Sequence, residues 1–310
     1  MKYIFTFAAL LFSFIGFAQN SDEFASKAKI EFENDNLKES LKLYGKAISI
    51  DTSNSDYYCQ RGQVYVQLNK FQEALIDFNK SIVLDNKNVD AFHNRAILYY
   101  SSQYPDYAIL DNNEALKYVK NDTLKHILYN NRGNAKAMKR DFQGAYEDYL
   151  KVLEFDSTDI GALTNMGAIL DDLGKDQEAI MYLERAIRVQ PDFIGGYGNL
   201  AVRYIKLGDF EKALSLNNKV ISMDPESALA FNNRGFVYYK MGDYKKALID
   251  INKSLKMYPS NSYAFKNRAL IYIAQKKRKD SCNDMAKAIE LGFTKMYGAE
   301  VEDLQKEHCK

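Results

Sequence analysis

The same arrangement of small and large apolar residues recurs along the chain every 34 residues. An aromatic residue or leucine stands four positions before each member of a series of small residues. That series is Ala28, Gly62, Ala96, Gly133, Gly167, Ala201, Gly235 and Ala269, with one slip of three residues near Asn121. Further series of mostly small residues follow 12 and 19 positions later. Helices approach closely where side chains are small, so the pattern predicts an antiparallel helix pair in each period.

The segment Gly242-Asp243-Tyr244-Lys245-Lys246-Ala247-Leu248 would lie between the two helices of one pair. It is similar to the turn between helices A and B of the tetratricopeptide repeat (TPR) family, and the whole pattern resembles that family. Pro191, Pro225 and Pro259 are spaced by 34 residues and stand where a helix must stop. The resemblance implies an all-α fold, a right-handed superhelical solenoid of about eight helix-turn-helix repeats.

Counting from Ser21 divides nearly the whole chain into repeats. We expect a TPR solenoid over residues 19–293 and a C-terminal capping helix over residues 294–310. The three added residues of the third repeat, around Lys120 to Lys125, are expected in its exit loop. The eight repeats begin at residues 21, 55, 89, 126, 160, 194, 228 and 262.

The first 18 residues do not follow the repeat pattern. Met1 and Lys2 precede an uncharged run from Tyr3 to Phe17, and small residues flank Phe17. The run is short for a membrane span, so we expect a signal peptide over residues 1–18, with a retained membrane helix as the alternative. The mature protein would begin at Gln19 and be exported to the periplasm, the exterior or the outer membrane of a Gram-negative bacterium.

Five repeats carry an arginine directly before the first small residue, and the same five carry an aspartate sixteen residues later. The other three repeats lack both residues. A buried charge needs a partner, so this co-occurrence predicts structural ion pairs between helices A and B or between repeats, in preference to a ligand-binding ladder. The predicted pairs are Arg61 with Asp77, Arg95 with Asp111, Arg132 with Asp148, Arg234 with Asp250, and Arg268 with Asp284.

Six repeats place an asparagine one residue before the arginine position. In the TPR family this position lines a concave groove, where an amide can bracket the backbone of an extended peptide. Bonding to the adjacent helix would satisfy the amide equally well, and both interpretations remain open. The candidate peptide-binding asparagines are Asn94, Asn131, Asn165, Asn199, Asn233 and Asn267.

Neighbouring groove positions would provide specificity. In the C-terminal half they combine aromatic residues with lysines, a composition typical of binding hot spots. Acidic residues (Asp22, Asp56, Asp90, Asp171 and Asp172) occupy comparable positions elsewhere, which predicts a polarised groove or a solvated face. The aromatic and basic candidates are Phe236, Tyr239, Lys240, Tyr263 and Lys266.

Composition narrows the possible functions. Formal net charge is +1, which gives no general attraction to nucleic acid, and the basic run Lys276 to Lys279 fits a solvated turn better than a nucleic-acid patch. The three histidines are scattered, and no catalytic motif stands in a suitable context, so we expect neither a metal, nor a cofactor, nor enzymatic activity. Cys282 and Cys309 could form a disulfide in an exported protein, or remain two reduced thiols.

The sequence therefore predicts a non-catalytic scaffold that binds a peptide or helix of a partner protein of unknown identity. Two alternatives remain: an envelope protein that binds cell-wall glycan through its tyrosines, or a non-catalytic subunit of an envelope enzyme complex. One variant of the family holds the C-terminal carboxylate of chaperone tails with lysines and an arginine. Here asparagine, serine or glutamine replaces that arginine in every repeat, which disfavours this activity.

Overall fold

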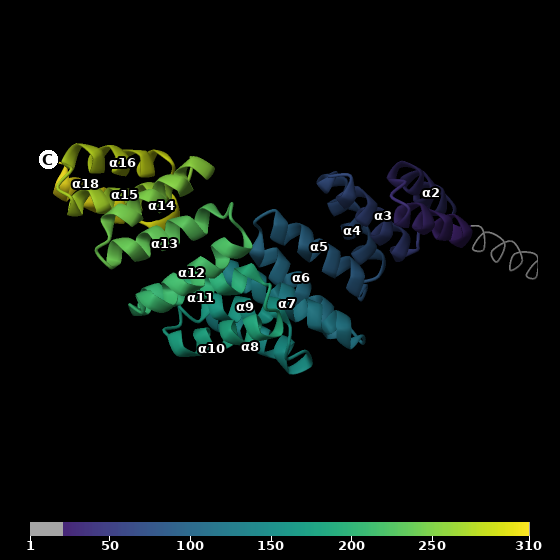
Figure 1. Ribbon diagram of the computed structural model, residues 1–310. Helices are drawn as coiled ribbons and strands as arrows, with labels where there is room; N and C mark the ends of the chain where they lie inside the picture. Colours follow the sequence, from purple (N-terminus) through teal and green to yellow (C-terminus); the bar gives the residue numbers. More distant parts are fainter. Residues whose placement is uncertain (1–20, 310) are drawn as a thin grey trace, which may run out of the picture. The chain divides into compact units, whose positions relative to one another are not determined.

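The computed structural model describes residues 21–309, and its helices follow one another in antiparallel pairs (Figure 1). The expected signal peptide lies outside the described residues. No strand occurs between residues 21 and 309, which confirms the all-α repeat fold. The first helix of each pair is called helix A and the second is called helix B.

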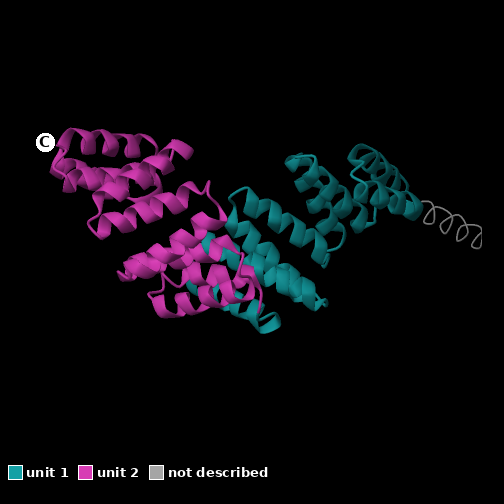
Figure 2. Ribbon diagram, viewed as in Figure 1, with its two compact units in different colours: residues 1–157 teal, residues 158–310 magenta. Residues whose placement is uncertain are grey.

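The chain divides into two compact units, residues 1–157 and 158–310 (Figure 2). In unit 1 a helix over residues 21–33 pairs with α2 (Leu37–Ile50). The further pairs of unit 1 are α3 (Ser55–Gln67) with α4 (Phe71–Leu84), α5 (Val89–Ser101) with α6 (Pro105–Tyr118), and α7 (Asp122–Met138) with α8 (Phe142–Phe155).

Unit 2 holds four more pairs, followed by two short helices, α17 (Phe293–Tyr297) and α18 (Glu300–His308). Within each unit a helix A contacts the helix A of the next pair, so the A helices form one continuous face of that unit. The pairs of unit 2 are α9 (Ile160–Ile169) with α10 (Asp176–Val189), α11 (Ile194–Leu207) with α12 (Phe210–Met223), α13 (Ala228–Lys240) with α14 (Tyr244–Met257), and α15 (Ser262–Ala274) with α16 (Arg278–Glu290).

Short polar side chains begin many of these helices. Asn88 Oδ1 accepts the backbone N–H of Ala91 at 2.9 Å and caps α5, and Asp243 accepts that of Lys246 at 3.1 Å and caps α14. Such caps satisfy backbone donors that have no partner within the helix.

The turn between helices A and B has the same backbone conformation in every repeat. One residue per turn is left-handed, with φ between 57° and 82°. Glycine adopts this conformation without steric cost, but five repeats place a residue with a side chain there. The left-handed residues are Asp35, Asn69, Gln103, Arg140, Gly174, Gly208, Gly242 and Lys276.

The small residues that define the period lie where helices A and B cross. A Cβ atom added to Gly62 would lie 2.5 Å from Cε1 of Phe78, and one added to Gly133 would lie 2.7 Å from Cε1 of Tyr149. No real Cβ atom tolerates such distances, so the large side chain of helix B requires the small residue of helix A.

The structure differs from the sequence prediction at two places. The added residues near Lys120 lengthen α7 instead of the exit loop, because Asn121 accepts the Leu124 N–H at 2.9 Å and starts the helix early. The expected single capping helix is divided into α17 and α18, because Gly298 between them has φ of +93° and cannot continue a helix.

Candidate functional site

The five arginine–aspartate pairs form bidentate ion pairs between helices A and B of the same repeat. In the first pair, Arg61 Nε donates to Asp77 Oδ2 at 2.7 Å and Arg61 Nη2 donates to Asp77 Oδ1 at 2.8 Å. The other four pairs repeat this geometry at 2.6–2.9 Å. The aspartate side chains are only 3–8% exposed. The hydrogen bond to the aspartate raises the pKa of Arg61, Arg234 and Arg268, so these guanidinium groups stay charged.

Four of these arginines also bind the preceding repeat. In each case Nη1 donates to the Oδ1 atom of an asparagine on the previous helix B, at 2.6–2.7 Å. The asparagine occurs in the repeats that precede these four arginines, a signal that comparison of neighbouring repeats could have found. All five pairs therefore join helices A and B, four of them also join neighbouring repeats, and their carboxylates are used within the protein. The asparagines are Asn79, Asn113, Asn218 and Asn252.

Several of the six candidate peptide-binding asparagines bond to protein groups, and Asn233 Oδ1, for example, accepts from Asn232 Nδ2 at 3.3 Å. Asn94 Nδ2 donates to the Asp90 carbonyl oxygen at 2.8 Å and lies 3.8 Å from Cys59 Sγ on the preceding helix A. Asn267 is 0% exposed, and its Nδ2 donates to Asn232 Oδ1 at 3.0 Å. For Asn267 the structure agrees with the second interpretation, bonding to a neighbouring helix, and not with a position on an open groove.

Asn199 and Asn233 both line a pocket of about 290 Å³ in unit 2, which we call the α11–α13 pocket. Apolar side chains, including Ile194, Val202 and Leu229, share its lining with the two amides. Asn131 on α7 and Asn165 on α9 are half-buried. The structure thus brings two of the six asparagines together beside apolar surface.

The aromatic and lysine candidates lie on two helices, α13 and α15, and Lys266 Nζ of α15 lies 5.7 Å from the ring centroid of Phe236 on α13. On α13, Lys240 Nζ lies 5.3 Å from the ring centroid of Phe236 and 5.8 Å from that of Tyr239, and Lys240 is exposed. Phe236 and Tyr239, by contrast, are half-buried.

On α15, Tyr263 packs against the rings of Phe293 and Tyr297, with centroids 5.7 and 5.3 Å away. Lys266 is only 5% exposed, and its Nζ atom binds Glu300 Oε1 of α18 at 3.0 Å. The C-terminal helices therefore engage the positions where the sequence pattern predicted open groove.

Several of the acidic positions also have internal partners. The Tyr57 hydroxyl donates to Asp22, Asn88 Nδ2 donates to Asp56 Oδ1 at 2.9 Å, and Asp171 forms ion pairs with Arg203 and Lys206. Part of the predicted acidic surface is thus neutralised within the repeats.

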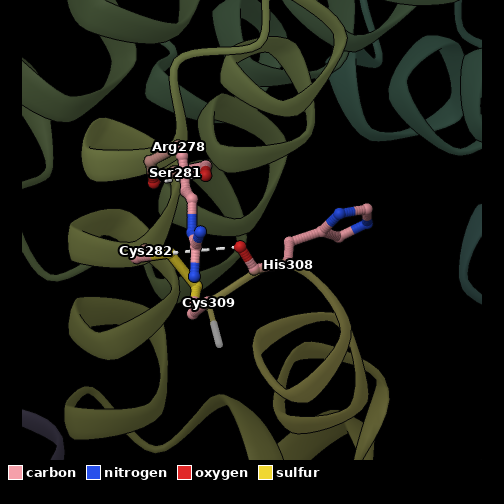
Figure 3. Close-up of a disulfide and its surroundings, with 5 residues drawn as sticks. All are labelled: Arg278, Ser281, Cys282, His308 and Cys309. Atoms are coloured by element: carbon pink, nitrogen blue, oxygen red, sulfur yellow. Dashed lines mark hydrogen bonds between the residues drawn. A yellow bond between two sulfur atoms is a disulfide. The ribbon is translucent and has the colours of Figure 1, made fainter.

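A disulfide joins Cys282 of α16 to Cys309, directly after α18, with Cα atoms 5.8 Å apart (Figure 3). It ties the last helix to the final repeat. Cys59 is a free cysteine and is 1% exposed. Burial raises the pKa of its thiol to about 12, so Cys59 is an inert core residue at neutral pH.

Neither a metal centre nor a membrane span is found within residues 21–309. That part of the chain has no cluster of three or more histidine, cysteine or acidic side chains arranged to hold a metal ion. Nor does it contain a helix with the length and hydropathy that crossing a membrane requires.

Sequence patterns described as "Tetratricopeptide repeat" match residues 160–193 and 228–261, and one described as "TPR repeat" matches residues 28–69, 62–103 and 202–242. Together with the paired helices and their fixed turn, these matches define the class. The chain belongs to the tetratricopeptide repeat family, whose members act as protein-interaction scaffolds.

Among curated proteins, the chain is 42% identical over 55 residues to an Hsp70-Hsp90 organizing protein of Triticum aestivum. That match covers 18% of this chain and 10% of the wheat protein, so the chain spans about a tenth of its relative. Among solved structures, a TPR protein from Parabacteroides merdae is 19% identical over 93% of this chain and 99% of its own, with a TM-score of 0.51. The APC/C assembly Cut9–Hcn1 is 18% identical over 81% of this chain and 48% of its own, with a TM-score of 0.61. Both structures support the fold alone.

Proposed function

We propose that this protein is a non-catalytic scaffold that binds a segment of a partner protein, as an extended peptide or a helix, on the A-helix face of α11 and α13. The observation that carries the proposal is the α11–α13 pocket, where Asn199 and Asn233 meet apolar side chains. Leu229 is 63% exposed and Val202 is 38% exposed, so apolar area is available to a partner. The amides would hold the partner's backbone, and the apolar wall would hold its side chains.

A peptide-display selection on the mature chain tests this proposal. The affinity of a selected peptide is measured by calorimetry for the wild type and for the double variant Asn199→Ala/Asn233→Ala. Because each lost hydrogen bond costs about 1 kcal/mol net, the double variant should bind roughly 10- to 30-fold more weakly.

Asn94→Ala is the matched control, because its amide already bonds to Asp90 and should not affect affinity. Unchanged binding by the double variant, or no selected peptide at all, would contradict the proposed function.

Contacts among the aromatic side chains favour a protein partner over a glycan. Stacking on a sugar uses an exposed ring face, but Tyr263 gives part of its ring surface to Phe293 and Tyr297, and Tyr239 is half-buried. We also do not propose binding of chaperone tails, despite the wheat match. The arginine that holds the tail carboxylate in that variant is replaced here by asparagine, serine or glutamine.

We further propose that the protein is exported after cleavage before Gln19. The uncharged run from Tyr3 to Phe17 supports export, and so does the disulfide between Cys282 and Cys309, because such bonds persist in oxidising compartments. Mass spectrometry of the native protein should find Gln19 as the first residue. An intact N-terminus in the cytosolic fraction would contradict export.

A further inference from the structure

Two repeats have an asparagine at a core position where the other six have a large apolar residue. The position lies sixteen residues after the first small residue of each repeat, and all eight side chains there are buried. Six repeats fill it with Tyr44, Phe78, Tyr149, Leu183, Ile251 and Met285. The other two have Asn112 and Asn217, which are 1% and 0% exposed.

The amide of Asn217, like that of Asn112, is only half satisfied. Its Nδ2 donates to the Ala213 carbonyl oxygen at 2.8 Å, but its buried Oδ1 atom has no hydrogen-bond partner in the described chain. Burying a polar acceptor without a partner is unfavourable, and an apolar side chain would serve the core better. Nothing in the packing of α12 itself explains this choice.

A second unfavourable residue lies nearby on α11. Gly198 is inside the helix, where glycine is less stable than alanine. A Cβ atom added to Gly198 would meet nothing within 4 Å, so no close neighbour requires glycine there. The missing side chain leaves open space.

Gly198 and Asn217 both line the α11–α13 pocket. Residues that destabilise the local fold and have no compensating structural role tend to cluster at functional sites. All the residues that line this pocket are uncharged, and most are apolar. Its volume of about 290 Å³ is at the small end of ligand pockets, which suits one side chain of a larger partner.

We infer that the α11–α13 pocket is the subsite for one aromatic side chain with a hydrogen-bond donor on its ring, a tryptophan or a tyrosine of the bound peptide. The inference rests on the proposed function and names the side chain that this site selects. The flat ring would pack on the apolar wall beside Gly198. The Asn217 side chain, which is 0% exposed, would turn toward the pocket, and its Oδ1 atom would accept the ring N–H or O–H.

The test uses small amides as probes, so it does not depend on knowing the partner. N-acetyl-tryptophanamide, N-acetyl-tyrosinamide and N-acetyl-phenylalaninamide are titrated into the ¹⁵N-labelled mature chain and followed by NMR. The tryptophan and tyrosine probes should shift the backbone amides of Gly195, Gly198 and Ala230. The phenylalanine probe, which has no ring donor, should bind at least five-fold more weakly.

Two variants separate pocket binding from folding. Gly198→Leu fills the pocket at a site with open space and should remove the shifts, whereas Gly45→Leu, also at an open helix position, should not. Asn217→Leu restores the apolar residue of other repeats, so it should raise the melting temperature. It also removes the Oδ1 acceptor, so the tryptophan and tyrosine probes should bind no more tightly than the phenylalanine probe. Asn112→Leu should raise the melting temperature without changing probe binding.

Three results would overturn the inference: no shifts at the pocket, equal affinity for all three probes, or unchanged binding by Gly198→Leu. The outcome is distinct from that of the proposed function. Selected peptides that require Asn199 and Asn233 but tolerate Gly198→Leu would contradict this inference and leave the proposed function in place. If no peptide were selected, the proposed function would fail, and the probe titration would still decide the specificity of the pocket.

Discussion

In four of the five ion pairs, all three side-chain nitrogen atoms of the arginine donate hydrogen bonds within the protein. Arg234 gives Nε and Nη2 to Asp250 and Nη1 to Asn218 of the preceding repeat. Such a network is stable only when it is complete, since a buried charge without its partner is costly. Two repeats of unit 2 lack the arginine and the aspartate together. One has Met166 with Tyr182, and the other has Leu200 with Leu216, so neither repeat has an unpaired charge at these positions.

Removing one residue of the ion pair should destabilise the protein more than replacing both residues with leucine. Arg234→Ala leaves Asp250 buried at 6% side-chain exposure without its cation, and should lower the free energy of unfolding by about 3 kcal/mol. Urea denaturation measures the change. The control is Arg234→Leu/Asp250→Leu, which copies Leu200 and Leu216 of the preceding repeat and should lose less than the single variant. Equal stability of Arg234→Ala and the wild type would refute the structural role.

The thiol of Cys59 should not react in the native protein. It is 1% exposed, and burial raises its pKa to about 12, so almost no thiolate exists at neutral pH. A colorimetric thiol assay without reductant should detect no thiol in the folded chain and one after denaturation. Rapid labelling of the folded protein would show that repeat two opens locally.

At the scale of the helix pair, the left-handed turn residue is a position where substitution by glycine can stabilise the protein. Gln103, Arg140 and Lys276 adopt φ of 65°, 64° and 59°, where a side chain crowds the backbone. Replacing each with glycine should raise the free energy of unfolding by about 0.5–1 kcal/mol. The same change at Asn69 should gain little, because asparagine tolerates this conformation. A gain at Asn69 equal to that at Lys276 would contradict the explanation by backbone strain.

The 34-residue period predicted the paired helices because equivalent positions of each repeat pack in the same way. It could not predict the early start of α7, which depends on the capping hydrogen bond of Asn121, or the break at Gly298. The site was predictable to the same extent. Spacing placed Asn199 and Asn233 on one face, but it could not predict the ion pair of Lys266 with Glu300, which lies outside the repeat pattern. Comparing the core position of Asn217 across repeats would have found that residue, whereas the pocket depends on packing.

At the scale of the whole molecule, the disulfide stabilises the end of unit 2. It closes a loop with a sequence separation of 27 residues. Reduction should lower the free energy of unfolding by about 3–4 kcal/mol in the chain-entropy model. The change is measured by urea denaturation with and without reductant, and Cys282→Ala/Cys309→Ala should match the reduced protein. Faster amide exchange should be confined to the helices that pack on the bond, and uniform loss of protection along the chain would contradict this assignment.

The two short helices α17 and α18 cover the apolar edge of the last repeat. Phe293 and Val301 are fully buried against Ala269, Met285 and Ala288, which form the apolar edge of the last repeat. In a stack of identical modules, an uncovered edge of this kind accepts another module, from the same chain or from a second copy. Here the chain's own last residues occupy that edge, and the disulfide holds them there. While α17 and α18 cover this edge, a further module cannot pack on it.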